Sequence, residues 1–248
     1  MRDFKLGVQL QPERTELDPL RDAWRELDRA GVDSIWVPDH FFPVSPGDPN
    51  GPNFECWSLL AAMAVDTSRA AFGALVSCVS YRNPDLLADM ARTVDLLSGG
   101  RLVLGLGAGW CEREYVEYGY SFESPAVRLR EFEDALVRIR ARLPRLNPAA
   151  PGLRTLIGGG GEKVTLRLVA EHADLWNAFG PADDYRRKNK LLDEWCERVG
   201  RDPSAIERSV FVDASEVDRI EEFLAAGAEH VIVGLAAPYD LSFLDRLG

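Results

Sequence analysis

The sequence predicts an α/β fold of the (β/α)8 TIM-barrel class. Short apolar or β-branched runs recur eight times along the 248 residues, and runs of this kind favour strands. Between them lie segments whose apolar residues are three or four positions apart, which is typical of amphipathic helices. Regular alternation of the two patterns favours a parallel sheet, and one barrel of this length buries a single large core.

The strand-like runs and the helical segments can be placed in order along the chain. The expected strands are Lys5–Leu10, Ser34–Val37, Phe72–Val79, Leu102–Leu106, Arg154–Ile157, Leu175–Phe179, Ser209–Val212 and His230–Leu235. The expected helices carry the apolar series Leu17, Leu20, Trp24, Leu27; Leu87, Met90, Val94, Leu97; Leu129, Phe132, Leu136, Ile139, Leu143; Val164, Leu168; Leu192, Trp195, Val199; and Val217, Ile220, Leu224.

Two other arrangements compete with one barrel domain over residues 1–248. An open doubly wound sheet is disfavoured because no G-x-G-x-x-G follows the first strand. A domain boundary at Pro144–Gly152, which holds three prolines in nine residues, would leave two halves with exposed parallel edges. We therefore expect a single closed barrel.

Composition and charge exclude several classes of protein. The chain is 46% hydrophobic and 28% charged, and it contains no apolar stretch of membrane-spanning length and no signal peptide. We therefore expect a cytoplasmic protein without a membrane partner. The formal charge of −11 opposes nucleic-acid binding, which needs a basic surface.

Metal and serine-hydrolase chemistry lack their usual signatures. No G-x-S-x-G elbow occurs, and the cysteines and histidines share no ligand spacing, so we expect no metal site. These residues are Cys56, Cys78, Cys111, Cys196, His40, His172 and His230.

Active sites of barrels lie at the carboxyl ends of the strands, and two loops that follow strands are unusually long, Pro38–Phe54 and Gly105–Pro125. Asp39 and His40 open the first loop. His40 exchanges protons near neutral pH, and Asp39 can hold a ring nitrogen or accept a hydrogen bond from a cofactor. The alternative is an Asp cap beside a packed His.

Glycines dominate the ends of the fourth and fifth strands. The run Gly105–Trp110 lets a flat ring approach the backbone, with Trp110 as a wall, although glycine also serves sharp turns. Gly158–Gly161 precede a helix, and bare N–H groups at a helix start form an anion site. Lys163 and Arg167 either add charge there or are solvated surface residues.

Five motifs spread over most of the chain form a set that is more specific than any one of them. They are Trp-Val-Pro-Asp-His at 36–40, Ser-Tyr-Arg-Asn-Pro at 80–84, Asp-Leu-Leu-Ser-Gly-Gly-Arg-Leu-Val-Leu-Gly-Leu-Gly-Ala-Gly-Trp at 95–110, Ile-Gly-Gly-Gly-Gly-Glu-Lys at 157–163 and Ala-Asp-Leu-Trp-Asn at 173–177. Together they resemble the luciferase-like monooxygenase superfamily, in its deazaflavin-using branch.

The resemblance implies a bacterial luciferase-like barrel that binds coenzyme F420, with FMN as the alternative, and moves a hydride to or from a small organic substrate. Asp39 would contact the deazaflavin, and His40 would lie near the hydride-transfer centre as acid, base or substrate anchor. Family habit and the apolar helical faces favour a homodimer.

The resemblance also implies roles for backbone groups around the cofactor. A non-proline cis peptide at the end of the third strand, matched here by Ala74-Leu75, would support the ring. Ala108 and Gly109 would line the ring, and Asn177 would add a polar contact. The phosphate would be held by Gly159, Gly160 and Gly161.

Three features depart from the family pattern. Trp110 stands where some deazaflavin dehydrogenases carry an acid. The region between Leu143 and Arg154 is shorter than in most relatives, so the pocket is expected to be either more open or completed by a second subunit. The chain ends soon after the eighth strand, so basic residues that bind the cofactor's phosphate or tail in longer members lack a certain equivalent. An FMN-dependent monooxygenase and a cofactor-binding protein without turnover therefore stay open as alternatives.

Overall fold

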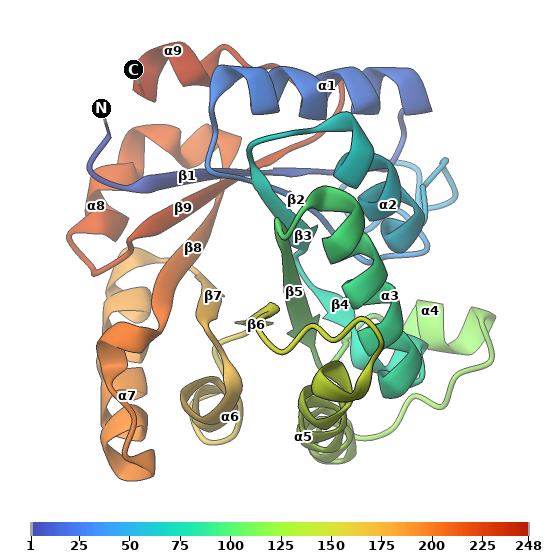
Figure 1. The fold of residues 1–248 in the computed structure, drawn as a ribbon. Coiled ribbons are helices and arrows are strands. Elements are labelled where there is room, and N and C mark those ends of the chain that lie inside the picture. The colour runs from blue at the N-terminus through green and yellow to red at the C-terminus, as the bar shows by residue number, and fades with distance from the viewer. Residues whose placement is uncertain (1, 248) are drawn as a thin grey trace.

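The structure is a computed structural model that describes residues 2–247, and it contains a closed parallel barrel surrounded by helices (Figure 1). The sheet runs β3-β2-β1-β9-β8-β7-β6-β5-β4, and pairing of β3 with β5 closes it. The predicted (β/α)8 barrel is confirmed. Its strands are β1 (Lys5–Leu10), β2 (Ser34–Val37), β3 (Ala71–Ala74), β4 (Ser77–Cys78), β5 (Leu102–Gly107), β6 (Arg154–Gly158), β7 (Leu175–Phe179), β8 (Glu207–Asp213) and β9 (His230–Leu235).

Helices follow the strands and cover the outer face of the barrel (Figure 1). They are α1 (Leu17–Ala30), α2 (Cys56–Asp66), α3 (Pro84–Ser98), α4 (Glu112–Glu117), α5 (Pro125–Arg142), α6 (Thr165–His172), α7 (Ala182–Val199), α8 (Ile220–Leu224) and α9 (Phe243–Leu247). Short 3-10 turns lie at Val79–Tyr81, Leu143–Arg145, Pro203–Ala205 and Ala214–Arg219. The last of these occupies the first half of the segment predicted as the helix around Val217.

Local sequence explains where the helices begin and end. In α3 the Asn83 side chain accepts the N–H groups of Asp85 and Leu86, and Pro84 takes the first helical position, where no N–H is needed. The helix ends at Gly99, whose φ of 71° is left-handed and so favours glycine. These signals fix the ends of the helix that follows the third strand.

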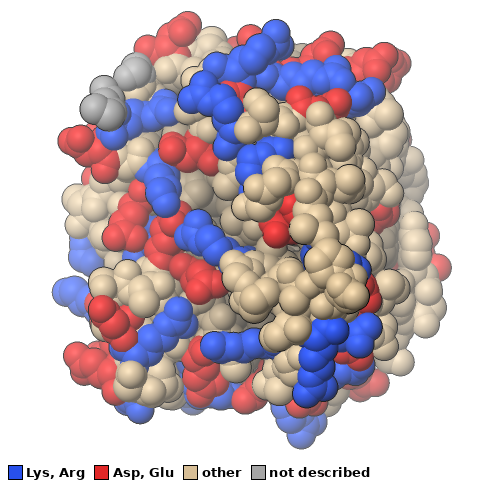
Figure 2. Space-filling view, in the orientation of Figure 1, with Lys and Arg blue, Asp and Glu red and all other residues tan. Residues whose placement is uncertain are grey.

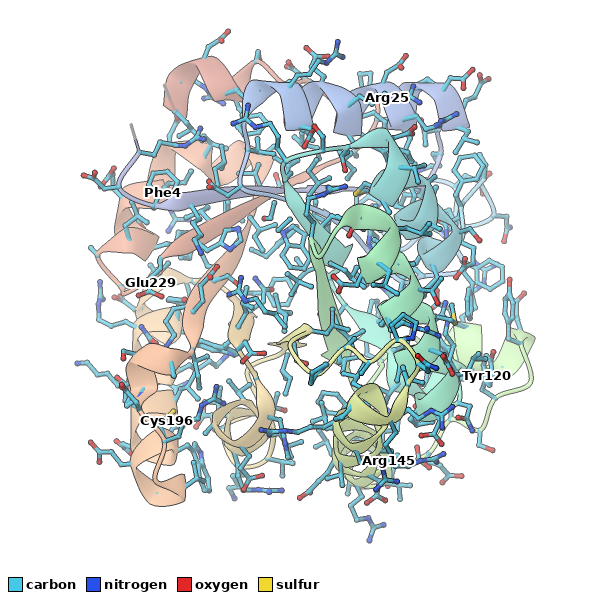
Figure 3. The ribbon with its side chains drawn as sticks, viewed as in Figure 1. Phe4, Arg25, Tyr120, Arg145, Cys196 and Glu229 are labelled. Carbon is cyan, nitrogen blue, oxygen red and sulfur yellow. The ribbon has the colours of Figure 1, made fainter. Side chains whose placement is uncertain are left out.

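The apolar core has two layers. Between the sheet and the helices, large side chains such as Trp24, Phe132 and Trp176 are fully buried. Inside the barrel, a smaller cluster includes Trp36 and Ile232. Side chains from the strands and from the helices fill the outer layer, and the buried Cys196 of α7 is one of them (Figure 3).

The third strand differs from its prediction. The expected run Phe72–Val79 is divided into β3 and β4, and a cis peptide joins Leu75 to Val76 between them. The predicted position of this bond, Ala74-Leu75, is wrong by one residue. The Leu75 N–H still donates to the Val37 carbonyl at 2.9 Å, so the regular ladder with β2 continues through the Ala74–Leu75 bond and breaks only after it.

The proline-rich segment 144–152 is a short connection from α5 to β6. Leu146, Ala150 and Leu153 are buried in the outer core layer. The strands on its two sides, β5 and β6, pair directly from Val103↔Arg154 to Leu106↔Ile157. Both halves of the chain therefore contribute to one closed sheet.

Acidic and basic side chains are interspersed over the face shown in Figure 2. Arg167 and Glu133 are one example of an ion pair between helices of the barrel's outer layer. Within residues 2–247, every helix is too short or too polar to cross a membrane.

Candidate active site

A cleft of about 470 Å³ lies at the carboxyl ends of the strands. Its lining includes the predicted site residues Asp39, His40, Leu75, Ala108, Gly109, Gly159 and Asn177. A smaller hollow of about 320 Å³ lies elsewhere, between α5 and α6 on the outer side of the barrel. Because the strand ends carry the active site in this fold, we assign the first cleft as the candidate active site.

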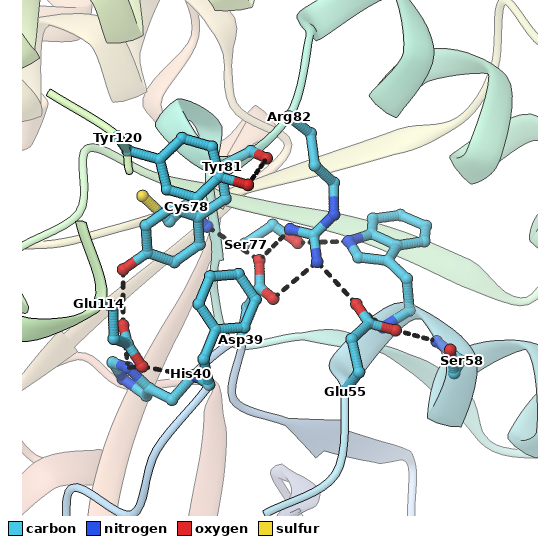
Figure 4. Close-up of polar contacts among 12 residues, drawn as sticks. Asp39, His40, Glu55, Ser58, Ser77, Cys78, Tyr81, Arg82, Glu114 and Tyr120 are labelled. Atoms are coloured by element: carbon cyan, nitrogen blue, oxygen red, sulfur yellow. Dashed lines mark hydrogen bonds and ion pairs between the residues drawn. The ribbon is translucent and has the colours of Figure 1, made fainter. Parts of the chain in front are cut away.

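His40 is held by a carboxylate that the sequence did not identify. Its Nδ1 lies 3.0 Å from Glu114 Oε2, and the Glu114 side chain is fully buried. Tyr81 donates its hydroxyl to the same carboxylate oxygen at 2.5 Å (Figure 4). The Phe41 N–H donates to the other oxygen at 2.6 Å.

These contacts fix the protonation of the group behind His40. Burial alone raises the pKa of Glu114, but hydrogen bonds from His40, Tyr81 and the Phe41 N–H outweigh it and hold the pKa below its ordinary value. Burial and the Glu114 hydrogen bond raise the pKa of Tyr81, so its hydroxyl stays a donor. A carboxylate at Nδ1 requires a proton there, which leaves Nε2 as the nitrogen free for chemistry.

Asp39, which lines the cleft, belongs to a second network of hydrogen bonds. Arg82 donates to both of its oxygens, at 2.6 and 3.0 Å, and the Cys78 N–H donates at 3.2 Å. Arg82 also contacts Glu55, which caps α2 (Figure 4). Asp39 thus ties the end of β2 to β4 and α2. Its predicted contact with the cofactor stays a prediction.

The floor of the cleft is built by Val76 against glycines. A Cβ at Gly107 would lie 2.6 Å from Val76 Cγ2, and one at Gly158 would lie 2.9 Å from Val76 Cγ1. A Cβ at Gly105 would lie 2.0 Å from the Ala74 carbonyl oxygen. Close approach to the segment Ala74–Val76 therefore requires glycine on β5 and β6, because the Val76 side chain and the Ala74 carbonyl fill the space that a Cβ would need.

The tetraglycine segment is only partly in the cleft. Gly159 lines the cleft, and its N–H donates to the Asn177 carbonyl at 2.9 Å. Gly160 packs against Lys188 of α7, where a Cβ would lie 2.9 Å from Nζ, and a Cβ at Gly161 would lie 2.7 Å from Thr165 Oγ1. Lys188, which also pairs with Asp184 at 2.7 Å, therefore places a cation next to this loop.

The two cations that the sequence suggested for this loop, Lys163 and Arg167, do not line the cleft. Arg167 pairs with Glu133 and Glu171 at 2.8 Å, which supports the alternative of a surface role. Lys163 is exposed. Asn177 is buried, and its amide donates to Ser209 Oγ at 3.1 Å.

Aromatic side chains form the rim of the cleft. Trp110 is 64% exposed, and its ring meets that of His40 edge-on at 5.5 Å between centroids. Phe179 is 60% exposed and contacts Phe211 at 5.6 Å. Trp110 thus forms a wall beside His40, as predicted, and the rim offers apolar surface to a ligand.

The two long loops of the mouth are bound to each other. Arg113 donates to the Pro49 carbonyl and to Asn50 Oδ1, each at 2.7 Å, and its guanidinium lies 4.0 Å from the Phe42 ring centroid. Phe41 stacks on Tyr118 at 4.1 Å. His40 and Glu114 are therefore held together by a contact between whole loops.

One group near the cleft has the composition of a metal site. Ligand atoms of His40, Cys111 and Glu114 lie within 4.8 Å of one another. Both Glu114 oxygens, however, already accept hydrogen bonds from Phe41 or Tyr81, and His40 Nδ1 faces the carboxylate. A metal would have to displace these bonds, so we do not assign one.

Sequence reasoning missed Glu114, Tyr81 and Lys188. Glu114 lies in the long loop after β5, four residues beyond the Trp110 position where an acid was sought. Tyr81 belongs to the motif 80–84, which was noted without a role. Lys188 belongs to the basic run 186–188 of α7, and this run was the available signal.

The fold and the site define a barrel enzyme, because an acid–base pair and bare glycine loops meet at the carboxyl ends of its strands. The model of the luciferase-like monooxygenase family matches residues 3–242. The chain belongs to this family.

Curated relatives support the same family. A phthiodiolone/phenolphthiodiolone dimycocerosates ketoreductase of Mycobacterium tuberculosis is 29% identical over 262 residues, which cover 88% of this chain. The match covers 66% of that relative, so the chain spans slightly less than two thirds of its length. An uncharacterised protein of the same organism is 26% identical over 91% of both chains.

Solved structures of the same fold contain both kinds of cofactor. An F420-dependent secondary alcohol dehydrogenase with a bound F420–acetone adduct superposes with a TM-score of 0.85 at 16% identity, covering 99% of this chain and 97% of that one. The FMN-bound oxygenating constituent of 3,6-diketocamphane monooxygenase of Pseudomonas putida superposes with a TM-score of 0.76 at 14% identity, covering 99% and 96%.

Proposed function

We propose that this protein is an F420-dependent oxidoreductase that moves a hydride between the deazaflavin and a small organic substrate. The observation that carries the proposal is the chain of hydrogen bonds from Tyr81 through Glu114 to His40, which ends in a cleft of about 470 Å³. The F420-dependent structural neighbour and the ketoreductase relative support this direction of chemistry.

The residues present fit a planar cofactor. Gly107 and Gly158 make room for the Val76 side chain, which lines the cleft and would clash with a Cβ at either position. We propose that Ala74 and Leu75 support the ring from below, with Ala108 and Gly109 along its edge. The phosphate would be held by Gly159, Gly160 and Gly161 with Lys188, and Asn177 would add a polar contact.

The bound cofactor would supply two-electron chemistry as a hydride acceptor or donor. The chain itself handles the proton. As a hydroxyl becomes a carbonyl, His40 takes the hydroxyl proton on Nε2, and in reverse it returns that proton. Glu114 keeps the other ring nitrogen protonated and stabilises the imidazolium that forms.

Titration with both cofactors, oxidised and reduced, tests the proposal. We expect coenzyme F420 to bind and its absorbance to change during turnover with a secondary alcohol. Tight FMN binding with oxygen consumption would instead support the second candidate, an FMN-dependent monooxygenase, which the FMN-bound neighbour favours. Binding without any turnover would support a cofactor-binding protein, and binding of neither would overturn the redox assignment.

We also propose a homodimer of cytoplasmic, single-domain subunits. An apolar groove runs between α2 and α3, and it is lined by Leu86 and Leu97, which are 55% and 53% exposed. Leu97 was predicted on the apolar face of its helix, and that face lies partly on the surface. Light scattering of the purified protein and of Leu86→Asp tests this: we expect a dimer that the substitution weakens.

A further inference from the structure

A chain of amide groups at the end of β1 has no role in the function proposed above. Gln9 is buried, and its Nε2 donates to the Leu75 carbonyl at 2.8 Å. Gln11 Nε2 donates to Gln9 Oε1 at 3.0 Å. Gln11 Oε1 is buried and has no hydrogen-bond partner within residues 2–247. Gln9 and Gln11 both belong to the cleft lining, which places this unpaired acceptor in the wall of the cleft.

The direction of this chain is fixed by its first member. A backbone carbonyl only accepts, so Gln9 must turn its NH2 group to Leu75 and its oxygen to Gln11. Gln11 must then donate its own NH2 group to the Gln9 oxygen, and the Gln11 oxygen has no partner. The Gln11 backbone is held too, because its N–H donates to Leu235 and its carbonyl accepts from Tyr239. Gln11 therefore directs its oxygen, and not its NH2 group, away from Gln9, and it holds this acceptor at a fixed place.

The charges around the cleft restrict which donor group of a ligand can bind this acceptor. Among residues 2–247, the cleft lining includes neither lysine nor arginine. Asp39 is paired with Arg82, and Trp110 and Phe179 make the rim apolar. A buried acceptor without a partner is unfavourable, so a ligand gains affinity by supplying a donor. An uncharged O–H or N–H group on an apolar body fits these surroundings.

We propose that Gln11 Oε1 is a ligand-binding acceptor that selects for an uncharged O–H or N–H donor, and that Gln9 is its positioning residue. The inference rests on the proposed function, because the ligand is either the ring cofactor or its substrate. Two sources supply the same chemistry: the ring N–H of a deazaflavin or flavin, and the hydroxyl of an alcohol. A ketone has no such donor.

Gln11→Met tests the proposal, because it removes the acceptor at similar side-chain length. Dissociation constants of F420, FMN, cyclohexanol and cyclohexanone are measured through the fluorescence of the protein's tryptophans, without turnover. Loss of one neutral hydrogen bond weakens binding about three- to tenfold. If the cofactor supplies the donor, F420 or FMN binds more weakly. If the substrate does, cyclohexanol alone binds more weakly and cyclohexanone is unaffected.

Gln9→Met is the matched variant for the positioning role. Without Gln9 the Gln11 amide can turn over and present its NH2 group, so the preference for cyclohexanol over cyclohexanone should shrink or reverse. Gln11→Asn, which withdraws the amide by one methylene, replaces the Met variant if that protein does not fold. Unchanged constants in a folded Gln11 variant that binds cofactor overturn this inference alone. Wild-type protein that binds neither cofactor overturns it together with the proposed function.

Discussion

A hydrogen-bonded histidine–glutamate pair lies at each end of the barrel. At the carboxyl end, His40 Nδ1 lies 3.0 Å from Glu114. At the amino end, His230 Nδ1 lies 2.8 Å from Glu207. The two pairs are nearly the same in composition and distance, but their surroundings differ.

The second nitrogen of each histidine makes the difference. His230 Nε2 lies 2.8 Å from Ser34 Oγ, and the side chain is only 3% exposed. Glu207 is also bound by Lys5 and Arg154, the first residues of β1 and β6. His40 is 19% exposed and lines the cleft. A histidine–glutamate pair therefore indicates chemistry only where one ring nitrogen remains free at the strand ends that carry the site.

The largest effect should come from His40→Ala. Removing a general acid–base group lowers kcat by about 10²- to 10⁴-fold, and cofactor affinity should change little because glycine backbone makes the cradle. Stopped-flow reduction of the cofactor and equilibrium titration measure the two separately. A variant with normal kcat would place the proton transfer elsewhere.

Glu207→Gln should destabilise the protein and leave kcat unchanged. Burial alone raises the pKa of Glu207, but hydrogen bonds from His230, Lys5 and Arg154 outweigh it and hold the pKa well below its ordinary value. Loss of the charge weakens the contact with the buried His230 and removes the ion pairs with the half-exposed Lys5 and Arg154, at a cost of about 1–3 kcal/mol in the free energy of unfolding. Urea denaturation measures this cost.

The pH dependence of that cost has a definite sign. Because the folded pKa of Glu207 is depressed, its stabilisation is fully present above the ordinary glutamate pKa and is lost as the pH falls through the folded value. The difference in the free energy of unfolding between wild type and Glu207→Gln should therefore become smaller in acid. A difference that becomes larger would contradict the assignment of a charged Glu207.

Glu114→Gln should differ from Glu207→Gln in both measurements: kcat should fall, and the free energy of unfolding should change less. The amide cannot stabilise an imidazolium as a carboxylate does, and its NH2 group would face the Phe41 N–H or the Tyr81 hydroxyl. We expect kcat to fall toward the lower limit for losing acid–base catalysis, about 10²-fold. Tyr81→Phe is the matched control, since it keeps the carboxylate and should cost less.

The smallest effect is expected at Asp66, outside both pairs. Hydrogen bonds from Arg21, Arg25 and Trp24 lower the pKa of Asp66 to about 2. Asp66→Asn should cost about 1–2 kcal/mol at neutral pH, since both arginines are partly exposed. The difference should disappear between about pH 4 and pH 2, where wild-type Asp66 becomes protonated. Thermal melting against pH measures it, and kcat should not change.

The fold was predictable because hydrophobic periodicity is local. All eight predicted strands are present, and the first two match β1 and β2 residue by residue. Periodicity did not locate the break at Leu75–Val76, because the run Phe72–Val79 is almost entirely apolar and periodicity does not report where a ladder ends.

The site was predictable only in part. His40 and the glycines follow strands directly, so their position in the fold identifies them. Glu114 is 74 residues from His40 in sequence, and their contact depends on how two irregular loops pack. Lys188 reaches the tetraglycine segment from the middle of a helix, so strand ends did not point to it.

The contact between the two loops at the mouth of the cleft limits how the substrate specificity can be redesigned. Because Arg113 donates hydrogen bonds to Pro49 and Asn50, and Phe41 stacks on Tyr118, the two loops pack together as one unit. Grafting either loop alone from a relative would separate the imidazole from its carboxylate. Redesign for new substrates should exchange residues 38–54 and 108–124 as a pair.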